Sequence, residues 1–358
     1  MAQRWVHAPP GSHWGEFGAD DQRGRLNLLT PAKVLQGVAQ VQAGRSFCLS
    51  LPLDVPGGQA MNPRRIAPRR YAVTRDGASA GQQGFCWAYA SEDADLSDVI
   101  NDDLVLMSLQ YSTQWDSLAH VGSLFDADGD GVAEPVFYNG YRAGQEIRPA
   151  PTDDHAREAH ARYPEPQAGA LGIEQMAEQG VQGRGVLIDL AHHLGRTRQA
   201  VGYDTLMRIL EADGIRIEPG DMVCLHTGFA DTLLAMNRQP DLAHLHATGS
   251  GLDGWDERLL QWIVDTRLAC LIADNPAVEL VVPKLTERRP HGQCLRQPRL
   301  PLHEHCLFKN GIHLGELWYL TELAAWLRAA GRHHFLLTAP PLRLPGAVGS
   351  PVTPIATV

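Results

Sequence analysis

The run Gly185-Val-Leu-Ile-Asp-Leu190 decides the fold, because it is a nearly continuous stretch of apolar residues. Such a run is typical of a strand that is covered on both faces of a sheet. Met222-Val-Cys-Leu-His226 and Leu268-Ala-Cys-Leu-Ile-Ala273 have the same character, and amphipathic segments at 203–213 and 259–266 separate the three runs. This alternation of strands and helices predicts an α/β fold whose sheet has a parallel component.

Polar residues stand at the carboxyl ends of two of these predicted strands. His226 closes the second run, and Asp274 directly follows the third. Ligands of open α/β sheets bind in the crevice outside the carboxyl ends of the strands. We therefore predict that His226 and Asp274 line a binding site for a small-molecule substrate.

Further elements are predicted on both sides of this central region. Thr30-Pro31 is typical of an N-cap followed by proline at the first helical position, so a helix is expected from Ala32 to Val41. Its apolar residues Val34, Leu35 and Val38 share one face. The other predicted elements are strands at 47–51, 104–107, 312–316 and 334–338, and helices at 172–180, 301–311 and 317–330.

The domain organisation is predicted to be simple. The chain of 358 residues is interpreted as a single α/β domain over 1–358, with an N-terminal arm over about 1–45. Two irregular excursions are expected over about 55–92 and 145–170, where proline and polar residues are frequent and periodicity is weak. Loops of this length are often functional.

Composition and charge exclude several function classes. Lys+Arg 31 against Asp+Glu 41 gives a net charge of −10, which disfavours a nucleic-acid partner. We expect no membrane span, because no run of eighteen apolar residues occurs, and no secretory signal, because the N-terminus has no hydrophobic core. The six cysteines form no Cys-x-x-Cys pair, which indicates reduced thiols and a cytoplasmic enzyme.

The sequence contains one dense cluster of polar residues, Gln110-Tyr-Ser-Thr-Gln-Trp-Asp-Ser-Leu-Ala-His120. If the apolar run 104–107 is a strand that continues through this stretch, Gln110, Gln114 and Asp116 share one face. His120 lies four residues beyond Asp116. These residue types suit a catalytic or metal site, and they suit a polar strand end with a satisfied histidine equally well.

A second segment offers the same pair of ligand types, His303 and Glu316. Metal-assisted hydrolysis needs such a set, because a divalent ion activates water and polarises a carbonyl while a nearby base handles protons. The segment Asp126-x-Asp128-x-Asp130-Gly131 begins like a calcium-binding loop, but its twelfth position is Phe137, so an acidic turn is predicted. No Gly-x-Ser-x-Gly, Gly-x-Gly-x-x-Gly or P-loop motif is present.

On these motifs the sequence resembles the metal-dependent cyclase family, which includes bacterial kynurenine formamidases and isatin hydrolases. The family hallmark is His-x-Gly-Thr-His-x-Asp-x-Pro-x-His. Its named positions are occupied here by Gln110, Ser112, Thr113, Gln114, Asp116, Leu118 and His120. The match also covers Trp14-Gly15, Tyr138-Asn139-Gly140, Arg184-Gly185-Val-Leu-Ile-Asp189, Gly220-Asp221, Asp274-Asn275-Pro276 and His303 through Glu316.

The resemblance implies a swivelling β/β/α-type α/β fold, usually a homodimer or homotetramer, that acts on a small molecule. It implies catalysis by His120 with Asp116, and one divalent metal (manganese, zinc or magnesium). The implied ligand positions are Asp116, Glu316, Gln110, Gln114 and His303. His305 is an alternative to His303 as the histidine ligand. The implied substrate-binding residues are Thr113, Trp115, Tyr138 and Asn139, beside His226 and Asp274.

The chain departs from the hallmark at Gln110 and Gln114, where the family has histidines that bind metal. An amide oxygen is a poorer ligand for zinc than an imidazole. Three interpretations follow: one manganese- or magnesium-like ion, weakly bound zinc, or a metal-free acid/base pair of His120 and Asp116. The expected activity is hydrolysis of an amide, formamide, lactam or lactone. The alternatives are a cyclase or dehydratase, and a binding protein on a decayed hydrolase scaffold.

Overall fold

A nine-stranded mixed sheet forms the centre of the molecule in the computed structural model, which describes residues 4–74, 84–150, 165–281 and 297–358. Its strands follow the order β1, β19, β17, β11, β13, β15, β16, β6 and β18. In that order their bounds are Ser46–Cys48, Ile355–Thr357, His334–Thr338, Gln182–Asp189, Met222–His226, Cys270–Ala273, His313–Glu316, Gln114–Asp116 and Gly349–Pro351. Strands β11, β13, β15 and β16 are parallel, so the predicted parallel component is confirmed.

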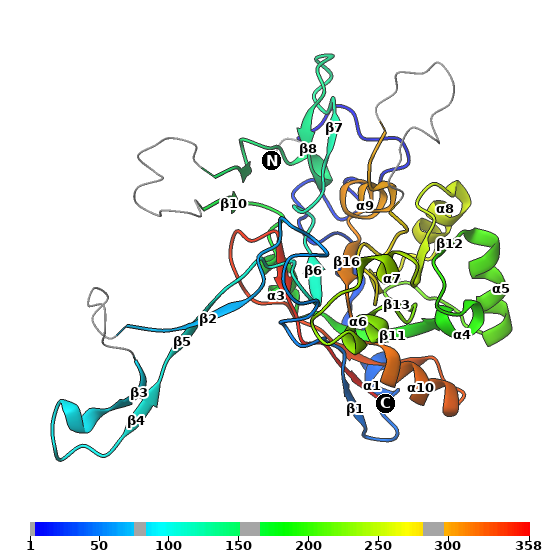
Figure 1. Cartoon of the computed structure of the whole chain (residues 1–358). Coiled ribbons are helices and arrows are strands. Elements are labelled where there is room, and N and C mark those ends of the chain that lie inside the picture. Colours follow the sequence, from blue (N-terminus) through cyan, green and yellow to red (C-terminus); the bar gives the residue numbers. More distant parts are fainter. Residues whose placement is uncertain (1–3, 75–83, 151–164, 282–296) are drawn as a thin grey trace.

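Side chains of β11 alternate between two hydrophobic cores, one on each face of the sheet. Val186 and Ile188 pack into the first core, and Leu187 packs into the second. Helices α5 and α8 contribute to the first core, and α3 and α10 contribute to the second (Figure 1). Their bounds are Tyr203–Asp213, Glu257–Asp265, Glu174–Gln179 and Thr321–Ala329. Burial on both faces explains the near-continuous apolar run that predicted β11.

Shorter elements complete the described chain. The remaining helices and helical turns are η1 (Gly24–Leu28), α1 (Pro31–Val38), η2 (Tyr89–Ser91), η3 (Tyr138–Gly140), α4 (Leu190–Leu194), α6 (Phe229–Ala235), α7 (Leu242–His246), α9 (Pro301–His303) and the π-helical turn η5 (Glu304–Lys309). Five two-stranded sheets pair β2 (Arg69–Ala72) with β5 (Asp103–Leu106), β3 (Phe85–Ala88) with β4 (Val99–Asn101), β7 (Ser123–Phe125) with β8 (Glu134–Val136), β9 (Ile147–Arg148) with β10 (Gln167–Ala168), and β12 (Gln199–Val201) with β14 (Ser250–Leu252).

The predicted continuous strand leading into Gln110 is wrong. The apolar run forms β5, which pairs with β2 outside the central sheet, and all of its residues are exposed. Residues 107–113 then turn, and the sheet strand β6 begins only at Gln114. Gln114 and Asp116 therefore share a strand face as predicted, whereas Gln110 lies in the preceding turn.

The helix predicted after Thr30 forms as α1, but it faces the sheet with a different side. The Thr30 hydroxyl accepts a hydrogen bond from the Lys33 amide, as the predicted cap requires. Leu35 and Val38, predicted to lie on its apolar face, are exposed, and the buried residues are Lys33 and Gly37. A Cβ atom at Gly37 would lie 2.7 Å from the backbone of Gly183, so glycine permits the close contact with β11.

The buried Lys33 has a charged partner. Its Nζ atom lies 3.0 Å from Asp221 Oδ1, and Arg184 donates two hydrogen bonds of 2.8 Å to the same carboxylate. A buried charge is tolerated when it is paired in this way. This ion network explains why the polar face of α1 is the one that packs on the sheet.

The two predicted excursions contain short strands. Strands β2 and β3 lie within 55–92 and form part of a ribbon that leaves the body of the molecule at the lower left of Figure 1. Within 145–170, β9 pairs with β10, and residues 151–164 lie outside the described residues. These predicted irregular excursions therefore include short strands, which the weak side-chain periodicity of the sequence did not indicate.

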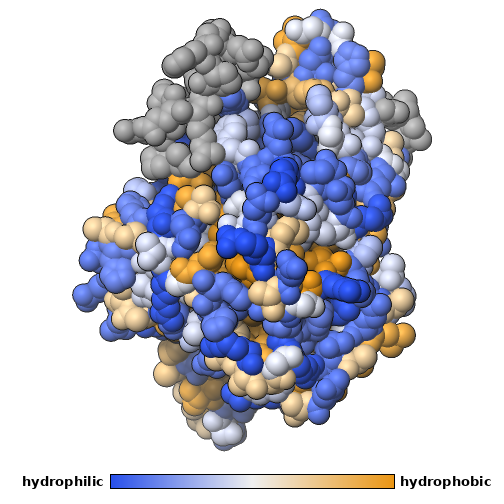
Figure 2. Space-filling view, turned by 90° about the vertical axis from the view of Figure 1, so that its right-hand side faces the viewer, coloured by the Kyte–Doolittle hydropathy of each residue, from blue (hydrophilic) through white to orange (hydrophobic). Residues whose placement is uncertain are grey.

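The surface is mostly polar on the side turned away from this ribbon. Figure 2 shows hydrophilic residues over most of that face, with small apolar patches between them. No helix among the described residues is long and apolar enough to cross a membrane. All five cysteines in the described part of the chain are free, and Cys224, Cys270 and Cys306 are buried.

Candidate active site

Two neighbouring strands bring the predicted ligands together. In the antiparallel pair of β6 and β16, Gln114 lies directly opposite Glu316. Side chains of one strand alternate in direction, so Asp116 projects to the same side as Gln114. Asp116, Glu316 and His303 are all buried. One potential metal-ligand atom from each residue lies within 4.8 Å of the other two. We call these three residues the carboxylate–histidine cluster.

Gln114 is hydrogen-bonded to both carboxylates of this cluster. Its Nε2 atom donates to Asp116 Oδ1 at 3.0 Å and to Glu316 Oε2 at 3.1 Å. The amide nitrogen, not the oxygen, therefore faces the ligand atoms. In this arrangement Gln114 holds the two carboxylates together, a role that differs from the predicted metal ligation through its carbonyl oxygen.

His303 is held by a residue that the sequence analysis missed, Glu279. The Nδ1 atom of His303 lies 2.7 Å from Glu279 Oε1, and its Nε2 atom lies 3.2 Å from Glu316 Oε1. Glu279 also accepts the backbone amides of Leu302 and His303. A carboxylate on Nδ1 is the arrangement that fixes the tautomer and orientation of metal-binding histidines. Glu279 escaped prediction because it lies 24 residues from His303 and in no recognised motif.

The rival histidine does not join the cluster. His305 Nε2 lies 3.3 Å from the side-chain amide of Asn310, within the π-helical turn η5. Burial, with a contribution from the positive charge of Lys309, lowers the pKa of His305 to about 4. The structure therefore selects His303 over His305 as the ligand candidate.

The charges of the cluster are strongly coupled. Burial raises the pKa of the Asp116 carboxyl; His120 opposes this shift, and the carboxylate of Glu316 adds to it. Burial would also raise the pKa of Glu316, but its hydrogen bond to His303 and the charge of that ring lower it overall. For His303, burial is outweighed by hydrogen bonds to Glu279 and Glu316, which raise its pKa to about 10.

These residues fit a divalent cation. Asp116 Oδ2 is a buried oxygen with no hydrogen-bond partner among the described residues, and it belongs to the ligand cluster. A buried acceptor without a donor is costly unless something else compensates it. Two carboxylates and one imidazole, whose Nδ1 atom is bonded to the Glu279 carboxylate, match the oxygen-rich and imidazole ligands of manganese, magnesium and zinc sites.

His120 lies at the solvent side of the cluster. Its Nε2 atom is 3.9 Å from Asp116 Oδ2, and its side chain is 24% exposed while that of Asp116 is fully buried. His120 belongs to the turn that follows β6, where its backbone amide donates a hydrogen bond to the Ser117 carbonyl. His120 can therefore reach both solvent and the buried carboxylate, as an acid/base residue must.

Two further polar groups lie beside the cluster. Arg65, from the predicted excursion 55–92, donates to Gln114 Oε1 at 3.5 Å. Its charge opposes the rise that burial causes in the pKa of Asp116, and it adds to the lowering that His303 causes in the pKa of Glu316. Gln110 lies against Gly349, the β18 residue that pairs with Asp116. A Cβ at Gly349 would meet Gln110 Nε2 at 2.5 Å, so the glycine leaves room for this amide on the Asp116 side of the strand.

The six predicted substrate-binding residues make their contacts within the protein, away from the carboxylate–histidine cluster. Trp115 projects to the opposite face of the sheet, where it packs against Trp318 and donates to the Ala339 carbonyl. Thr113 bonds to the backbone of Leu51 and Leu317. Because strand alternation turns Trp115 away from Asp116, its predicted contact with substrate is wrong.

Tyr138 and Asn139 fasten the N-terminal segment to the body. Asn139 accepts from the Gly15 amide and donates to the carbonyls of Gly18 and Asp21. The Tyr138 hydroxyl is 3.4 Å from Asp21 Oδ2, and its ring is fully buried. Both polar atoms of the Asn139 side chain are thus bonded within the protein, which is a structural role instead of the predicted contact with substrate.

His226 and Asp274 lie at the carboxyl edge of the sheet, as predicted, but both are engaged. His226 Nδ1 lies 2.7 Å from Asp189 Oδ1. Asp274 accepts three hydrogen bonds, from the amide and hydroxyl of Thr227 and from the Gly228 amide. The two residues therefore organise the loop after β13, and no hydrogen bond joins either of them to the carboxylate–histidine cluster within the described chain.

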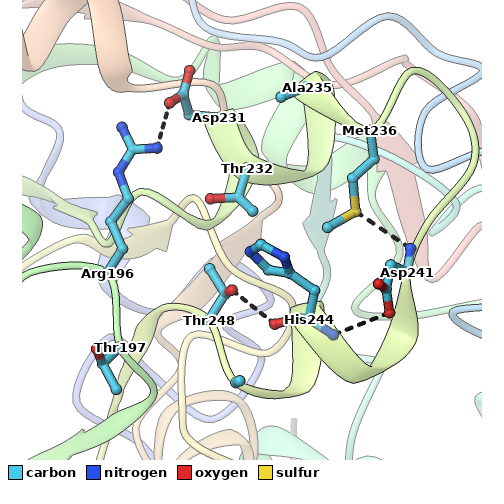
Figure 3. A pocket seen from close by; sticks show the side chains of 10 residues that line it. Arg196, Thr197, Asp231, Thr232, Ala235, Met236, Asp241, His244 and Thr248 are labelled. Atoms are coloured by element: carbon cyan, nitrogen blue, oxygen red, sulfur yellow. Dashed lines mark hydrogen bonds and ion pairs between the residues drawn. The ribbon is translucent and has the colours of Figure 1, made fainter.

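Two other features lie apart from the cluster. Asp126, Asp128 and Asp130 accept hydrogen bonds from backbone amides of the turn between β7 and β8, and their ligand atoms also lie within 4.8 Å of one another. A hollow of about 900 Å³ is lined by residues of α6 and α7 and of the segments beside them. In Figure 3 the ring of His244 stands between Thr232 and Thr248. None of the residues that line this hollow belongs to the cluster.

Comparisons with known proteins agree with this fold. The family model described as "Putative cyclase" matches residues 86–280. The crystal structure of "a novel cyclase" is 29% identical over 97% of this chain and 97% of that chain, with a TM-score of 0.68. A comparison with curated proteins finds no match.

Two isatin hydrolases are similar in fold. Isatin hydrolase A from Labrenzia aggregata, bound to benzyl benzoate, is 12% identical over 88% of this chain and 93% of that chain, with a TM-score of 0.51. An isatin hydrolase bound to the product analogue thioisatinate is 13% identical over 91% and 95%, with a TM-score of 0.50. The α/β fold expected from the resemblance is therefore confirmed.

Proposed function

Because the chain belongs to the cyclase family, we propose that it is a hydrolase whose active site is the carboxylate–histidine cluster with His120. The observation that carries this proposal is that Asp116, His303 and Glu316 lie close together. His120 lies on the solvent side of these three residues, 3.9 Å from Asp116. The bond that it opens belongs to an amide, formamide, lactam or lactone.

One divalent ion is proposed to bind at Asp116, His303 and Glu316. The oxygen-rich ligand set favours manganese or magnesium, and zinc is the alternative. Such an ion, when bound, polarises a carbonyl and lowers the pKa of water. Gln114 keeps the two carboxylates in place on this account, and Gln110 lies against Gly349, the β18 partner of Asp116.

The residues of the chain supply the proton transfers. His120 takes a proton from the attacking water and returns it to the leaving nitrogen or oxygen. The carboxylate of Asp116 stabilises the positive ring of His120 between these two steps. The Arg65 guanidinium, anchored on Gln114, places a positive charge beside the site where a carbonyl oxygen becomes negative.

A cyclase or dehydratase is the second candidate, because the similar protein of known structure with 29% identity is described as a cyclase. The same acid/base pair serves that reaction, in which water is lost and not added. A binding protein without catalysis is the non-enzymatic alternative. Intact Asp116, His120 and Glu316 argue against it, because a site that only binds has no need for a solvent-side base.

Mass spectrometry of reaction mixtures distinguishes the three candidates. Purified protein supplied with manganese is incubated with a panel of aromatic formamides, lactones and cyclic amides, with isatin included because two fold neighbours act on it. A hydrolase adds the mass of one water to a panel member, and a cyclase or dehydratase removes that mass. Ligand-induced thermal stabilisation with no change of mass across the panel contradicts the enzymatic proposal.

The predicted cytoplasmic location and the assembly state remain proposals. The scattered cysteines, which indicate reduced thiols, support the proposed location, and the resemblance to dimeric or tetrameric proteins supports the proposed assembly.

A further inference from the structure

The residue that follows the proposed ligand Glu316 has an unusual backbone conformation. Leu317 has a φ of 55°, which lies in the left-handed region that residues other than glycine rarely adopt. Its side chain is buried. Such a conformation persists only where the surrounding structure holds it, and it occurs often at ligand clamps. Contacts to the Leu317 backbone are therefore expected to hold this turn in place.

Both backbone groups of Leu317 are bonded to neighbouring segments. The Thr113 hydroxyl donates a hydrogen bond of 2.5 Å to the Leu317 carbonyl, and the Leu317 amide donates one of 3.1 Å to the Asn275 carbonyl. The same hydroxyl accepts a bond of 2.9 Å from the Leu51 amide, so it is used both as a donor and as an acceptor. Because Thr113 is only 2% exposed, solvent has little access to these bonds.

The left-handed turn gives Glu316 and Leu317 separate surroundings. The Leu317 side chain packs in a third hydrophobic core together with Leu51, Val55, Phe229, Ala230, Leu233 and Leu245. The Glu316 side chain instead joins the carboxylate–histidine cluster. The angle φ of Leu317 sets how the peptide between the two residues is turned relative to the chain that follows. It therefore also affects the direction in which Glu316 points.

The Glu316 carboxylate is supported only by groups of the site itself. Its Oε1 atom lies 3.2 Å from His303 Nε2, and its Oε2 atom accepts from Gln114. The carboxylate makes no other hydrogen bond within the part of the chain that the structure describes. His303, by contrast, has Glu279 behind its ring. The position of the Glu316 carboxylate therefore depends on its backbone, which strand pairing fixes before it and Leu317 fixes after it.

We propose that Thr113 is a positioning residue, whose hydroxyl holds the turn at Leu317 and thereby directs the Glu316 carboxylate toward the divalent ion. This inference rests on the proposed metal site. Thr113 precedes Gln114 and Leu317 follows Glu316, so their bond closes the pair of β6 and β16 where Gln114 and Glu316 face each other. An action through Leu317 replaces the contact with substrate that the resemblance implied for Thr113.

The metal affinity of Thr113 variants tests this role without any need for a substrate. Dissociation constants of manganese and zinc are measured by competition with a chelating dye on folded protein. Thr113→Val keeps the shape of the side chain and removes the hydroxyl. It should weaken binding by about tenfold or more, as the loss of a group that orients a metal ligand does. Thr113→Ser keeps the hydroxyl and should bind both ions as the wild type does.

A buried threonine outside the cluster provides the matched control. The Thr248 hydroxyl donates a bond of 2.8 Å to the His244 carbonyl, and Thr248 is 8% exposed. Thr248→Val also loses one buried hydrogen bond, so its stability in urea should fall, but its metal affinity should stay that of the wild type. If Thr113→Val does not fold, Thr113→Cys takes its place, because a thiol is only a weak donor. It should bind manganese more weakly than Thr113→Ser.

The possible failures are distinguishable from one another. Equal affinity of Thr113→Val and wild type, or of Thr113→Cys and Thr113→Ser, overturns the positioning role alone. A loss in Thr113→Ser as large as that in Thr113→Val also overturns it, because the hydroxyl would then not be the cause. A folded wild type that binds neither ion overturns the proposed metal site, and the positioning role with it.

Discussion

Gln114 and Glu316 face each other across strands β6 and β16, and the Gln114 amide bonds to Glu316 at 3.1 Å and to Asp116 at 3.0 Å. Two buried carboxylates repel each other, so the shared donor stabilises their approach. A glutamine at this position therefore has a use that differs from that of the histidine in the family hallmark. It organises the two acidic ligands without itself presenting an oxygen to them.

Replacing Gln114 by leucine should destabilise the metal-free protein. The substitution removes the donor from two buried carboxylates, which costs about 1–3 kcal/mol in the free energy of unfolding. Urea denaturation in the presence of a chelator measures this loss. Gln110→Leu is the control, because Gln110 is only half-buried and makes no hydrogen bond to either carboxylate among the described residues. Equal stability of Gln114→Leu and wild type would show that the amide does not hold the pair.

Glu279→Gln should weaken metal binding while the fold stays intact. The substitution removes the Glu279 carboxylate that bonds to His303 Nδ1 and orients the ring. Loss of a partner that orients a metal-binding histidine typically costs about 10–100-fold in metal affinity. Competition with a chelating dye gives the dissociation constant directly. Glu304→Gln is the matched control, because Glu304 neighbours His303 in sequence but bonds to Ser123. Unchanged affinity in Glu279→Gln would reject the positioning role.

His120→Ala should abolish most of the turnover and leave the metal content unchanged. Removal of a positioned acid/base group typically costs about 10²–10⁴-fold in rate. The rate is measured on the substrate found by mass spectrometry, and the metal is measured on the same preparation. His244→Ala, a change in the open hollow of Figure 3, should retain full activity. Retained turnover in His120→Ala would transfer the acid/base role to another residue.

The pair of Asp189 and His226 should make stability depend on pH. Burial alone would raise the pKa of Asp189, but the hydrogen bond and charge of His226 lower it below its ordinary value of 3.8. Burial alone would lower the pKa of His226, but its hydrogen bond to Asp189 raises it above 6.5. The aspartate contribution is lost as pH falls below 3.8, and the histidine contribution is lost as pH rises through the raised pKa, above 6.5.

The stability difference between wild type and His226→Asn should therefore be largest between pH 3.8 and 6.5 and should shrink on both sides. Urea denaturation at a series of pH values measures it. His246→Asn, at an exposed histidine of α7, should show no such dependence. A difference that grows above pH 6.5 would contradict the direction of the His226 shift.

Local apolar patterns predicted the centre of the fold well. Strand β13 and helix α5 have the predicted bounds. A strand buried on both faces gives a continuous apolar run, whereas a helix buried on one face gives apolar residues at helical spacing. The run Leu104–Met107 forms a strand as predicted, but the strand does not continue through Gln110. It pairs with β2 on a ribbon, and the sequence does not reveal which strand a run pairs with. The orientation of α1 was missed because a charge pair, Lys33 with Asp221, replaces apolar packing.

The candidate site was predictable only in part. Asp116, His303 and Glu316 stand out in the sequence as two segments that each offer a carboxylate and an imidazole, the family resemblance gives them ligand positions, and the structure brings them together. Glu279 and Arg65 were missed because each meets the cluster through contacts across long stretches of chain. The spacing of residues along a strand indicates a shared face, but it carries no information on which loop closes over that face.

Metal titration of chelator-treated protein tests the central claim most directly. Isothermal titration calorimetry with manganese, followed by zinc and magnesium, is compared for wild type, Asp116→Asn and His303→Ala. The cluster predicts one ion bound per chain in the wild type and a loss of that binding in both variants. No binding of any of the three ions to a folded wild type, or the same binding in His303→Ala as in wild type, would contradict it.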